Sequence, residues 1–224
     1  MLDNKIMQGH PLVYFDSAAT SLKPKQVIEA MNDYYFNYNS NVHRGDYDIA
    51  AKTDSVYENA REVIAKFINA ESKELIFTSG TTQSINLVAF GYALKHLNEG
   101  DEIILNEAEH ASNILPWYEI ANKKNLVVKF AKLNEQGQVT IDSLKEVINE
   151  KTKLVTIQRS KGYQTRPTLS VTRIGELIQF IKKIKPDVIC MVDNCYGEFV
   201  EEIEPSDVGA DMVVGSLIKN PGGG

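Results

Sequence analysis

The sequence predicts an α/β fold with three layers, α/β/α, around a mostly parallel sheet. Two observations lead to this prediction. Short apolar runs rich in β-branched residues alternate along the chain with amphipathic helical patterns, which is the order typical of parallel sheets with crossover helices. Polar and charged side chains also follow directly after several of these runs. In open α/β sheets the groups that handle ligands sit at these carboxyl ends of the strands.

The first third of the chain predicts two helices joined by a polar loop. Pro24 suits the first turn of the first helix, which has apolar residues at helical spacing: Val27, Ala30, Met31 and Tyr34. A long amphipathic helix is expected over residues 49–68, and its predicted buried face consists of Val56, Ala60, Val63, Ile64 and Phe67. The loop between them holds His43 and Arg44, which either bind an anion or are solvated.

A strand is expected over residues 74–78 and a helix over residues 83–97, with Ser79-Gly80-Thr81-Thr82 between them. The free amides and the dipole of a helix N-terminus attract phosphate, and the hydroxyls of Thr81 and Thr82 add hydrogen bonds. The alternative is an ordinary helix cap with no ligand. A P-loop is excluded, because no Gly-Lys-Ser/Thr follows the glycine.

The remaining segments continue the alternation of strands and helices. The expected strands are residues 101–105, 126–130 and 153–157, and two runs at 191–196 and 212–219. The expected helices are one that holds Trp117, one over 140–149, and one from Ser170 or Thr172 to Lys185. His110 follows the strand at 101–105, where an imidazole either stacks on an aromatic ring, shuttles a proton or caps the next helix.

Each of the last two apolar runs carries one charged side chain near its end, Asp193 in one and Lys219 in the other. An acid and an amine at strand ends could hold the two ends of a flat cationic heterocycle. Pyridoxal 5'-phosphate (PLP) requires this pair, a lysine for a Schiff base and an aspartate for the pyridinium nitrogen. The alternative is that both charges simply face solvent.

The composition excludes several classes of protein. Apolar residues make up 43% and charged residues 24% of the 224 residues, which are ordinary globular values. The net charge of −6 and the scattered Lys and Arg predict no nucleic-acid partner. The two cysteines, Cys190 and Cys195, have no zinc or iron–sulfur spacing, so we expect no metal site and a reducing cytoplasm. No signal region or membrane-spanning stretch is present, so we expect no membrane partner.

Two stretches of the chain resemble two different PLP-dependent families of fold type I, the aspartate aminotransferase superfamily. Residues 13–155 resemble class V aminotransferases, most closely cysteine desulfurases, through residues 14–20, 41–45, 77–89 and 109–117. Residues 150–224 resemble the aluminium-resistance or methionine γ-lyase-like family through residues 152–163, 192–199 and 215–224. The sequence therefore reads as a hybrid with a seam near residues 146–155.

The resemblance implies a domain organisation and a set of cofactor-binding residues. Residues 1–20 would be an N-terminal segment and 21–224 a PLP-binding large domain, truncated after the PLP lysine so that the C-terminal domain is absent. Thr81, Thr82 and Ser216 would contact the phosphate. His110 would stack on the pyridine ring, Asp193 would pair with its nitrogen, and Tyr196 would also bind the cofactor. Lys219 would form the Schiff base and carry protons, which makes Lys219 and His110 the implied catalytic residues.

The implied function is that of a PLP-dependent cysteine desulfurase-like protein acting on a sulfur-containing amino acid, which in the family converts L-cysteine to L-alanine and sulfur. A homodimer is expected. Two alternatives stay open, a γ-lyase-type carbon–sulfur lyase and a catalytically inactive PLP-binding fragment. Neither Cys190 nor Cys195 aligns with the desulfurase catalytic cysteine, which lies beyond Lys219 in that family. The resemblance also leaves Arg166 as a possible carboxylate ligand, and whether the chain is an enzyme stays open.

Overall fold

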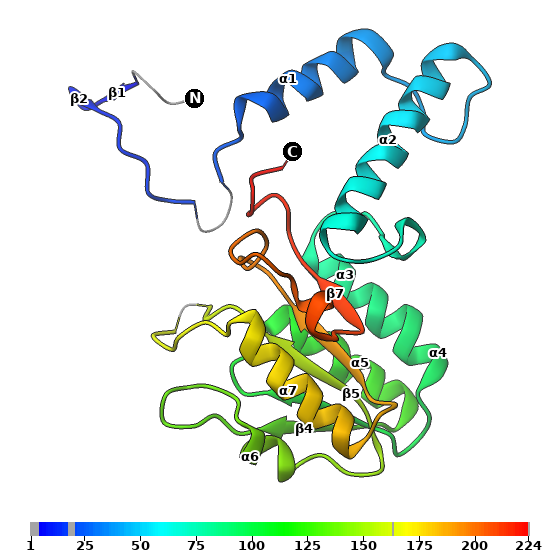
Figure 1. The fold of residues 1–224 in the computed structure, drawn as a ribbon, viewed down its shortest axis with the longest axis vertical. Coiled ribbons are helices and arrows are strands. Elements are labelled where there is room, and N and C mark those ends of the chain that lie inside the picture. Colours follow the sequence, from blue (N-terminus) through cyan, green and yellow to red (C-terminus); the bar gives the residue numbers. More distant parts are fainter. Residues whose placement is uncertain (1–4, 18–20, 163, 224) are drawn as a thin grey trace. The chain divides into compact units, whose positions relative to one another are not determined.

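The computed structural model describes residues 5–17, 21–162 and 164–223 (Figure 1). These residues form two compact units, one of residues 1–76 with 217–224 and the other of residues 77–216. The division predicted from the sequence, 1–20 and 21–224, stays a prediction. Because Asp193 and Lys219 belong to different units, each unit is described by itself.

The second unit contains a five-stranded sheet in the order β4-β3-β5-β6-β7. Its strands are β3 (Glu102–Asn106), β4 (Val127–Ala131), β5 (Thr152–Gln158), β6 (Ile189–Asp193) and β7 (Met212–Val214). Every pairing in this sheet is parallel, which confirms the predicted α/β class. The strand predicted over residues 74–78 is wrong, because residues 75–78 belong to no strand. A short apolar run shows that a segment suits a strand, but it does not show that a neighbouring strand pairs with it.

Helices connect the strands of this unit. They are α3 (Thr81–Leu87), which continues without a break through the π-helical η3 (Val88–Ala93) into α4 (Leu94–His96), then α5 (Leu115–Lys124), α6 (Ile141–Lys145) and α7 (Val171–Ile184). Two short 3₁₀ segments, η4 (Ala111–Asn113) and η5 (Pro205–Val208), follow β3 and precede β7. The predicted starts of α6 near residue 140 and of α7 at Ser170 are confirmed, since Thr140 and Ser170 are the N-caps and accept hydrogen bonds from Ser143 N and Arg173 N.

Hydrophobic clusters cover both faces of the sheet, which confirms the three layers. Successive side chains of a strand point to opposite faces. Ile104 of β3 accordingly packs into one cluster with Leu144 of α6 and Leu177 of α7. Its neighbours Ile103 and Leu105 pack into the other cluster, whose helical members include Ile85, Ala89, Trp117 and Ile120.

The strand order creates a topological switch point between β3 and β5. From β3 the chain crosses to β4 on one side, whereas from β5 it crosses to β6 on the opposite side. In open α/β sheets the crevice at such a point, outside the carboxyl ends of the strands, is where ligands bind. The fold therefore directs attention to the residues that follow β3, β5 and β6.

The first unit contains a hairpin, two α-helices and two shorter helical segments. These are β1 (Ile6–Met7), β2 (His10–Pro11), α1 (Lys25–Asp33), the π-helical η1 (Tyr34–Tyr38), α2 (Asp48–Phe67) and the 3₁₀ segment η2 (Ser72–Glu74). Both predicted helices are therefore confirmed. Pro24 is the N-cap of α1. Among the described residues, no helix has the length and apolar character needed to span a membrane.

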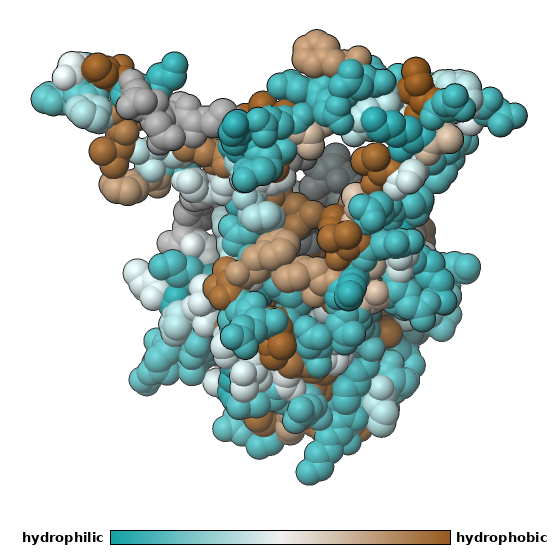
Figure 2. Space-filling model, turned by 45° about the horizontal axis from the view of Figure 1, so that its top comes forward, coloured by the Kyte–Doolittle hydropathy of each residue, from teal (hydrophilic) through white to brown (hydrophobic). Residues whose placement is uncertain are grey.

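The predicted buried face of α2 is wrong. Val56 is 45% exposed and Val63 is 60% exposed, whereas the buried residues of the helix are Ala50, Thr53 and Ala65. Helical periodicity identifies an apolar face, but burial also requires another element to pack against that face. Hydrophobic side chains accordingly lie among hydrophilic ones on the surface drawn in Figure 2.

Leu177 of α7 provides a test of this core, because it is fully buried in the cluster with Ile104. We expect Leu177→Ala to lower the free energy of unfolding by about 2–5 kcal/mol, since it removes apolar contacts and leaves a cavity. Denaturant unfolding measures the change. The exposed Gln179 on the same helix is the control, and Gln179→Ala is expected to have little effect. Equal losses in the two variants would contradict the assignment of this helix face to the core.

Candidate functional site

The turn after β3 places His110 at the switch point. Asn106, the last residue of the strand, accepts a hydrogen bond from Ala108 N through Oδ1 (3.0 Å) and from Glu109 N through its carbonyl (3.2 Å). His110 N then donates to Oε1 of Gln158, the last residue of β5, at 2.5 Å. This bond ties the turn after β3 to the end of β5, with His110 exposed at the carboxyl edge of the sheet.

The ring of His110 is oriented by the segment that follows. Its Nδ1 accepts a hydrogen bond from Ser112 N (3.1 Å) and lies 2.7 Å from Ser112 Oγ, so it caps η4. An Nδ1 that accepts from a backbone amide leaves the proton of the neutral ring on Nε2. The capping role that the sequence left open is therefore present, and the same cap fixes the direction of an imidazole that remains exposed.

Asp193 lies at the same edge, as the last residue of β6. It is 4% exposed, and its Oδ1 accepts a hydrogen bond from Cys195 N at 3.1 Å. Asp193 is also the register partner of Gln158. Since Gln158 binds His110 N through its side chain, β5 brings the predicted ring-stacking residue and the predicted ring-nitrogen partner to one edge of the sheet.

The helix that starts at Thr81 is tied to the end of β7. Gly80, its N-cap, has a φ of +148°, a conformation that favours glycine. Thr81 Oγ1 donates to the carbonyl of Gly215 (2.8 Å) and lies 2.9 Å from Cys195 Sγ. The hydroxyl of Thr81 therefore joins this helix start to the segment that carries Ser216. Thr82 follows and is exposed.

Glu198 is a buried acid that the sequence analysis did not identify. Its Oε1 accepts a hydrogen bond from Ser216 N at 2.5 Å, and a Cβ added at Gly215 would clash with the same oxygen. Burial raises the pKa of Glu198 to about 7. A larger residue at position 215 would have to displace the carboxyl group of Glu198, and the backbone of Ser216 is held by a carboxyl group that can be neutral near neutral pH.

Glu109, directly before His110, was also missed. It is 7% exposed and hydrogen-bonded through both carboxyl oxygens, and burial raises its pKa to about 8. The sequence shows only a polar residue in a polar turn, and it contains no signal that this side chain turns inward while His110 turns outward. The geometry of the turn determines which of these two adjacent side chains is buried and which is exposed.

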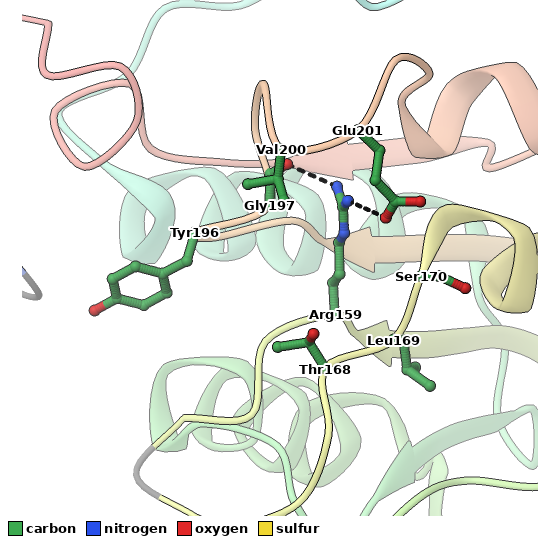
Figure 3. A pocket seen from close by; sticks show the side chains of 8 residues that line it. All are labelled: Arg159, Thr168, Leu169, Ser170, Tyr196, Gly197, Val200 and Glu201. Carbon is green, nitrogen blue, oxygen red and sulfur yellow. Dashed lines mark hydrogen bonds and ion pairs between the residues drawn. The ribbon is translucent and has the colours of Figure 1, made fainter.

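Arg159, which follows β5, centres a second buried polar cluster (Figure 3). It is 3% exposed; NH1 donates to Asn194 Oδ1 and to the carbonyl of Gly197, each at 2.8 Å, and NH2 donates to Glu201 Oε1 at 2.6 Å. The buried Glu204 lies 3.7 Å away and accepts from Asn194 Nδ2. The guanidinium thereby fixes the loop after β6.

A cavity of about 170 Å³ lies beside this cluster and includes Tyr196, one of the predicted cofactor-binding residues. It is lined by Arg159, Thr168, Leu169, Ser170, Tyr196, Gly197, Val200 and Glu201. The backbone φ of Tyr196 is +69°, and its ring points away from the guanidinium of Arg159 in Figure 3. The role predicted for Tyr196 stays a prediction.

Lys219 belongs to the other unit, where its backbone carbonyl accepts a hydrogen bond from Ser21 Oγ. The strand predicted over residues 212–219 is shorter than expected: β7 ends at Val214 and does not reach Lys219. The reason lies in the next two residues, whose backbone groups bind side chains instead of a neighbouring strand: Gly215 O accepts from Thr81 and Ser216 N donates to Glu198.

Three further side chains complete the description. Arg166 is buried, its NH2 donates to Ser160 O at 2.7 Å, and its Nε has no hydrogen-bond partner among the described residues. Burial lowers the pKa of Arg166. Cys190 is fully buried and burial raises the pKa of its thiol to about 12, which leaves it unreactive; Cys195 is buried beside Thr81. No cluster suited to a metal ion occurs in the described part of the chain.

The residues at this edge fit a flat cofactor that carries a phosphate. The first amides of the helix from Thr81 have no intrahelical partner, its first turn holds no acidic residue, and a Cβ at Gly80 would meet open space. That end can accept an anion. The carboxyl group of Asp193 and the exposed imidazole of His110 offer the acid and the aromatic face that a pyridine ring needs.

The chain is similar to several known proteins. The sequence model of the family described as aminotransferase class-V matches residues 13–223. A "Probable cysteine desulfurase" of Staphylococcus aureus (strain Mu50 / ATCC 700699) is 48% identical over 158 residues, which are 70% of this chain and 38% of that relative. The chain thus spans well under half the length of this curated relative.

Two solved structures are similar in fold. The apo structure of the cysteine desulfurase from Thermococcus onnurineus NA1 matches with a TM-score of 0.83 and 34% identity, over 95% of this chain and 51% of that one. A proposed cystathionine beta-lyase involved in aluminium resistance, from Listeria monocytogenes str. 4b F2365, matches with a TM-score of 0.65 and 32% identity, over 87% of this chain and 50% of that one. Both resemblances seen in the sequence therefore have structural counterparts.

Replacing Arg159, the centre of the buried polar cluster, should strongly lower the stability of the fold. We expect Arg159→Met to lower the free energy of unfolding by roughly 3–5 kcal/mol, because it leaves the buried Glu204 without its cationic neighbour. The matched control is Arg173→Met, which breaks the partly exposed pair with Glu176 and should cost about 0–1 kcal/mol. Chemical denaturation measures both, and similar values for the two variants would contradict a structural role for Arg159.

Proposed function

The chain belongs to the class-V aminotransferase family, and from this premise we propose that it is the large domain of a PLP-dependent, cysteine desulfurase-like protein that acts on a sulfur-containing amino acid. The observation that carries the proposal is the arrangement at the carboxyl edge of the sheet. There Gln158 of β5 connects the exposed His110 after β3 with the buried Asp193 of β6. An imidazole and a carboxylate at a topological switch point match the chemistry of a PLP site.

We assign the phosphate to the helix that starts at Thr81. Its N-terminal amides and dipole attract an anion, and the exposed Thr82 adds a hydroxyl donor. Ser216 is placed beside this helix end by the bond from Thr81 to Gly215. Thr81 already donates to Gly215 O, so its hydroxyl contributes mainly by holding the helix end and Ser216 together.

We assign the ring to Asp193 and His110. The carboxyl group of Asp193 is oriented by Cys195 N and is shielded from water, so it can hold a proton at a ring nitrogen through a charge-assisted hydrogen bond. His110, fixed through Nδ1, presents its ring at the same edge and carries a proton on Nε2. When bound, PLP supplies an electron sink next to the Cα atom of the amino acid.

We assign the amine that binds the cofactor aldehyde to Lys219. A free lysine has a pKa of about 10.4, so it must lose its proton before the amine can act as a nucleophile or a base. Lys219 then moves protons to and from the substrate. We extend the proposal to a homodimer in the cytoplasm with a small amino-acid substrate and no nucleic-acid or membrane partner.

A second candidate function is a carbon–sulfur lyase of the γ-lyase type. The observation that favours it is the similarity to the Listeria monocytogenes cystathionine beta-lyase-like structure. The third candidate is a PLP-binding protein without catalytic activity. Products separate the three: alanine and sulfur or sulfide for a desulfurase, a keto acid and ammonia for a lyase, and none for an inactive protein.

The cofactor assignment predicts a visible absorption band when PLP is added to the chain. We expect Lys219→Ala to abolish the band, because it removes the amine that binds the aldehyde. The control is Lys183→Ala on α7, an exposed lysine whose removal should leave the band unchanged. No band in the parent chain would contradict PLP binding, and a band that persists in Lys219→Ala but is lost in another lysine variant would reassign the lysine.

The ring assignment predicts a separate effect for Asp193. We expect Asp193→Asn to weaken PLP binding or to make the absorption spectrum of the bound cofactor change with pH. The reason is that an amide cannot hold the ring nitrogen in its protonated form. The spectrum is recorded from pH 6 to pH 9 in the parent and the variant. An unchanged spectrum over this range would place the ring nitrogen elsewhere.

A further inference from the structure

Glu109 joins three segments beneath the turn that carries His110. Its Oε1 accepts hydrogen bonds from Asn106 Nδ2 (2.5 Å) at the end of β3 and from Thr156 Oγ1 (2.8 Å) in β5. Its Oε2 accepts from Asn113 Nδ2 (2.8 Å) in η4. One buried side chain thus connects the strand before His110, the neighbouring strand and the segment that His110 caps.

Two of these three donors have a fixed direction. The amide of Asn106 is oriented because its Oδ1 accepts from Ala108 N, and the amide of Asn113 is oriented because its Oδ1 accepts from Trp117 Nε1 at 3.0 Å. The hydroxyl of Thr156 differs, since it can rotate and either donate or accept. A protonated Glu109 can therefore donate to Thr156 Oγ1 and still accept from both amides, so the cluster satisfies the neutral carboxyl group.

The charges that face Glu109 come from two sides. The pKa of Glu109 is raised to about 8, mainly by burial and also by the negative charge of Asp193, against the opposing effects of the hydrogen bonds from Thr156 and Asn113 and of the positive charge of Arg166. At neutral pH the carboxyl group is therefore mostly protonated. An ionised Glu109 would add a second negative charge within electrostatic reach of Asp193, in a region shielded from water.

We propose that Glu109 is a positioning residue of the PLP site: its neutral carboxyl group holds the turn that carries His110 in place without adding a second negative charge that acts on Asp193. The inference rests on the proposed function for its purpose, but the protonation and the locking are properties of this chain and exist without the cofactor. Glu109 does not touch the reacting atoms; it acts through the position of His110 and through the charge near Asp193.

The protonation has a measurable consequence for stability. A glutamate with a folded pKa of about 8, above its ordinary value of 4.5, takes up a proton on folding. Stability therefore falls as pH rises from about 4.5 to about 8, and this contribution is constant above that range. Glu198, with a pKa of about 7, contributes a similar fall that ends one pH unit earlier. The two falls overlap, so the contribution of Glu109 is isolated by comparing variants rather than by the pH interval alone.

The test uses the 224-residue chain without added PLP, so that it is independent of cofactor binding. We expect Glu109→Gln to reduce the fall in unfolding midpoint between pH 7 and pH 8, because the variant carries no titrating group at this position and only the fall due to Glu198 remains. The matched control is Glu107→Gln, an exposed glutamate in the same turn, which should keep the fall. A fall that persists unchanged in Glu109→Gln would overturn the assigned protonation.

The locking of the turn needs a readout that stability alone does not provide. The imidazole ¹H–¹⁵N signals of His110 should shift with a midpoint near pH 8 in the parent and in Glu107→Gln, and lack this transition in Glu109→Gln. Glu109→Ala should displace these signals at every pH, whereas Gln should restore them at pH 7. His110 signals that are identical in the parent and in Glu109→Ala would overturn the positioning role.

A direct titration keeps the proposal falsifiable if the variants do not fold. The ¹³C carboxyl signals of the parent chain should contain two glutamates that titrate near or above pH 7, and Glu198→Gln should remove the lower one. A single such signal, lost in Glu198→Gln, would overturn the proposal. If PLP gives no band with the parent chain but the Glu109 signals behave as expected, the proposed function fails while the protonation and locking by Glu109 stand.

Discussion

Polar side chains buried at the carboxyl edge of the sheet must be hydrogen-bonded, and this requirement shapes the region around the candidate site. Glu109 holds the turn after β3, Arg159 holds the loop after β6, and Glu198 holds the amide of Ser216. Each of these three side chains makes hydrogen bonds to groups on neighbouring elements in place of hydrogen bonds to water. The loops that carry His110, Asn194 and Ser216 are thereby fixed relative to the strands they follow, which a site built from loop residues requires.

The hydrophobic core and the polar edge have separate tasks. The two clusters of aliphatic side chains hold helices against both faces of the sheet and set the positions of the strand ends. The polar edge then decides which side chains stay exposed at those ends. Asp193 and His110 illustrate the difference, because Asp193 ends a buried strand and is itself buried, whereas His110 is exposed in a turn whose preceding residue, Glu109, is buried. Two buried carboxyl groups near each other also favour a neutral state for one of them.

Much of the fold follows from local sequence patterns, and the exceptions share one cause. The alternation of strands and helices, the helix starts near Thr140 and Ser170, and the strand that ends at Asp193 are visible in the sequence because each depends on neighbouring residues. The predictions for residues 74–78, for the buried face of α2 and for the length of the last strand were wrong. Each of these depends on whether a distant segment packs or pairs there, which periodicity does not encode.

The sequence by itself determined the α/β class, the family, and the set of residues assigned to a PLP site. It could do so because strand ends, glycine turns and the motifs around them are continuous stretches of chain. Only the tertiary structure decided that Gln158 links His110 to the edge that bears Asp193, and that Glu109 and Glu198 are buried acids with raised pKa values. The physical reason is that burial and long-range hydrogen bonds arise between segments far apart in the chain, so no single stretch contains them.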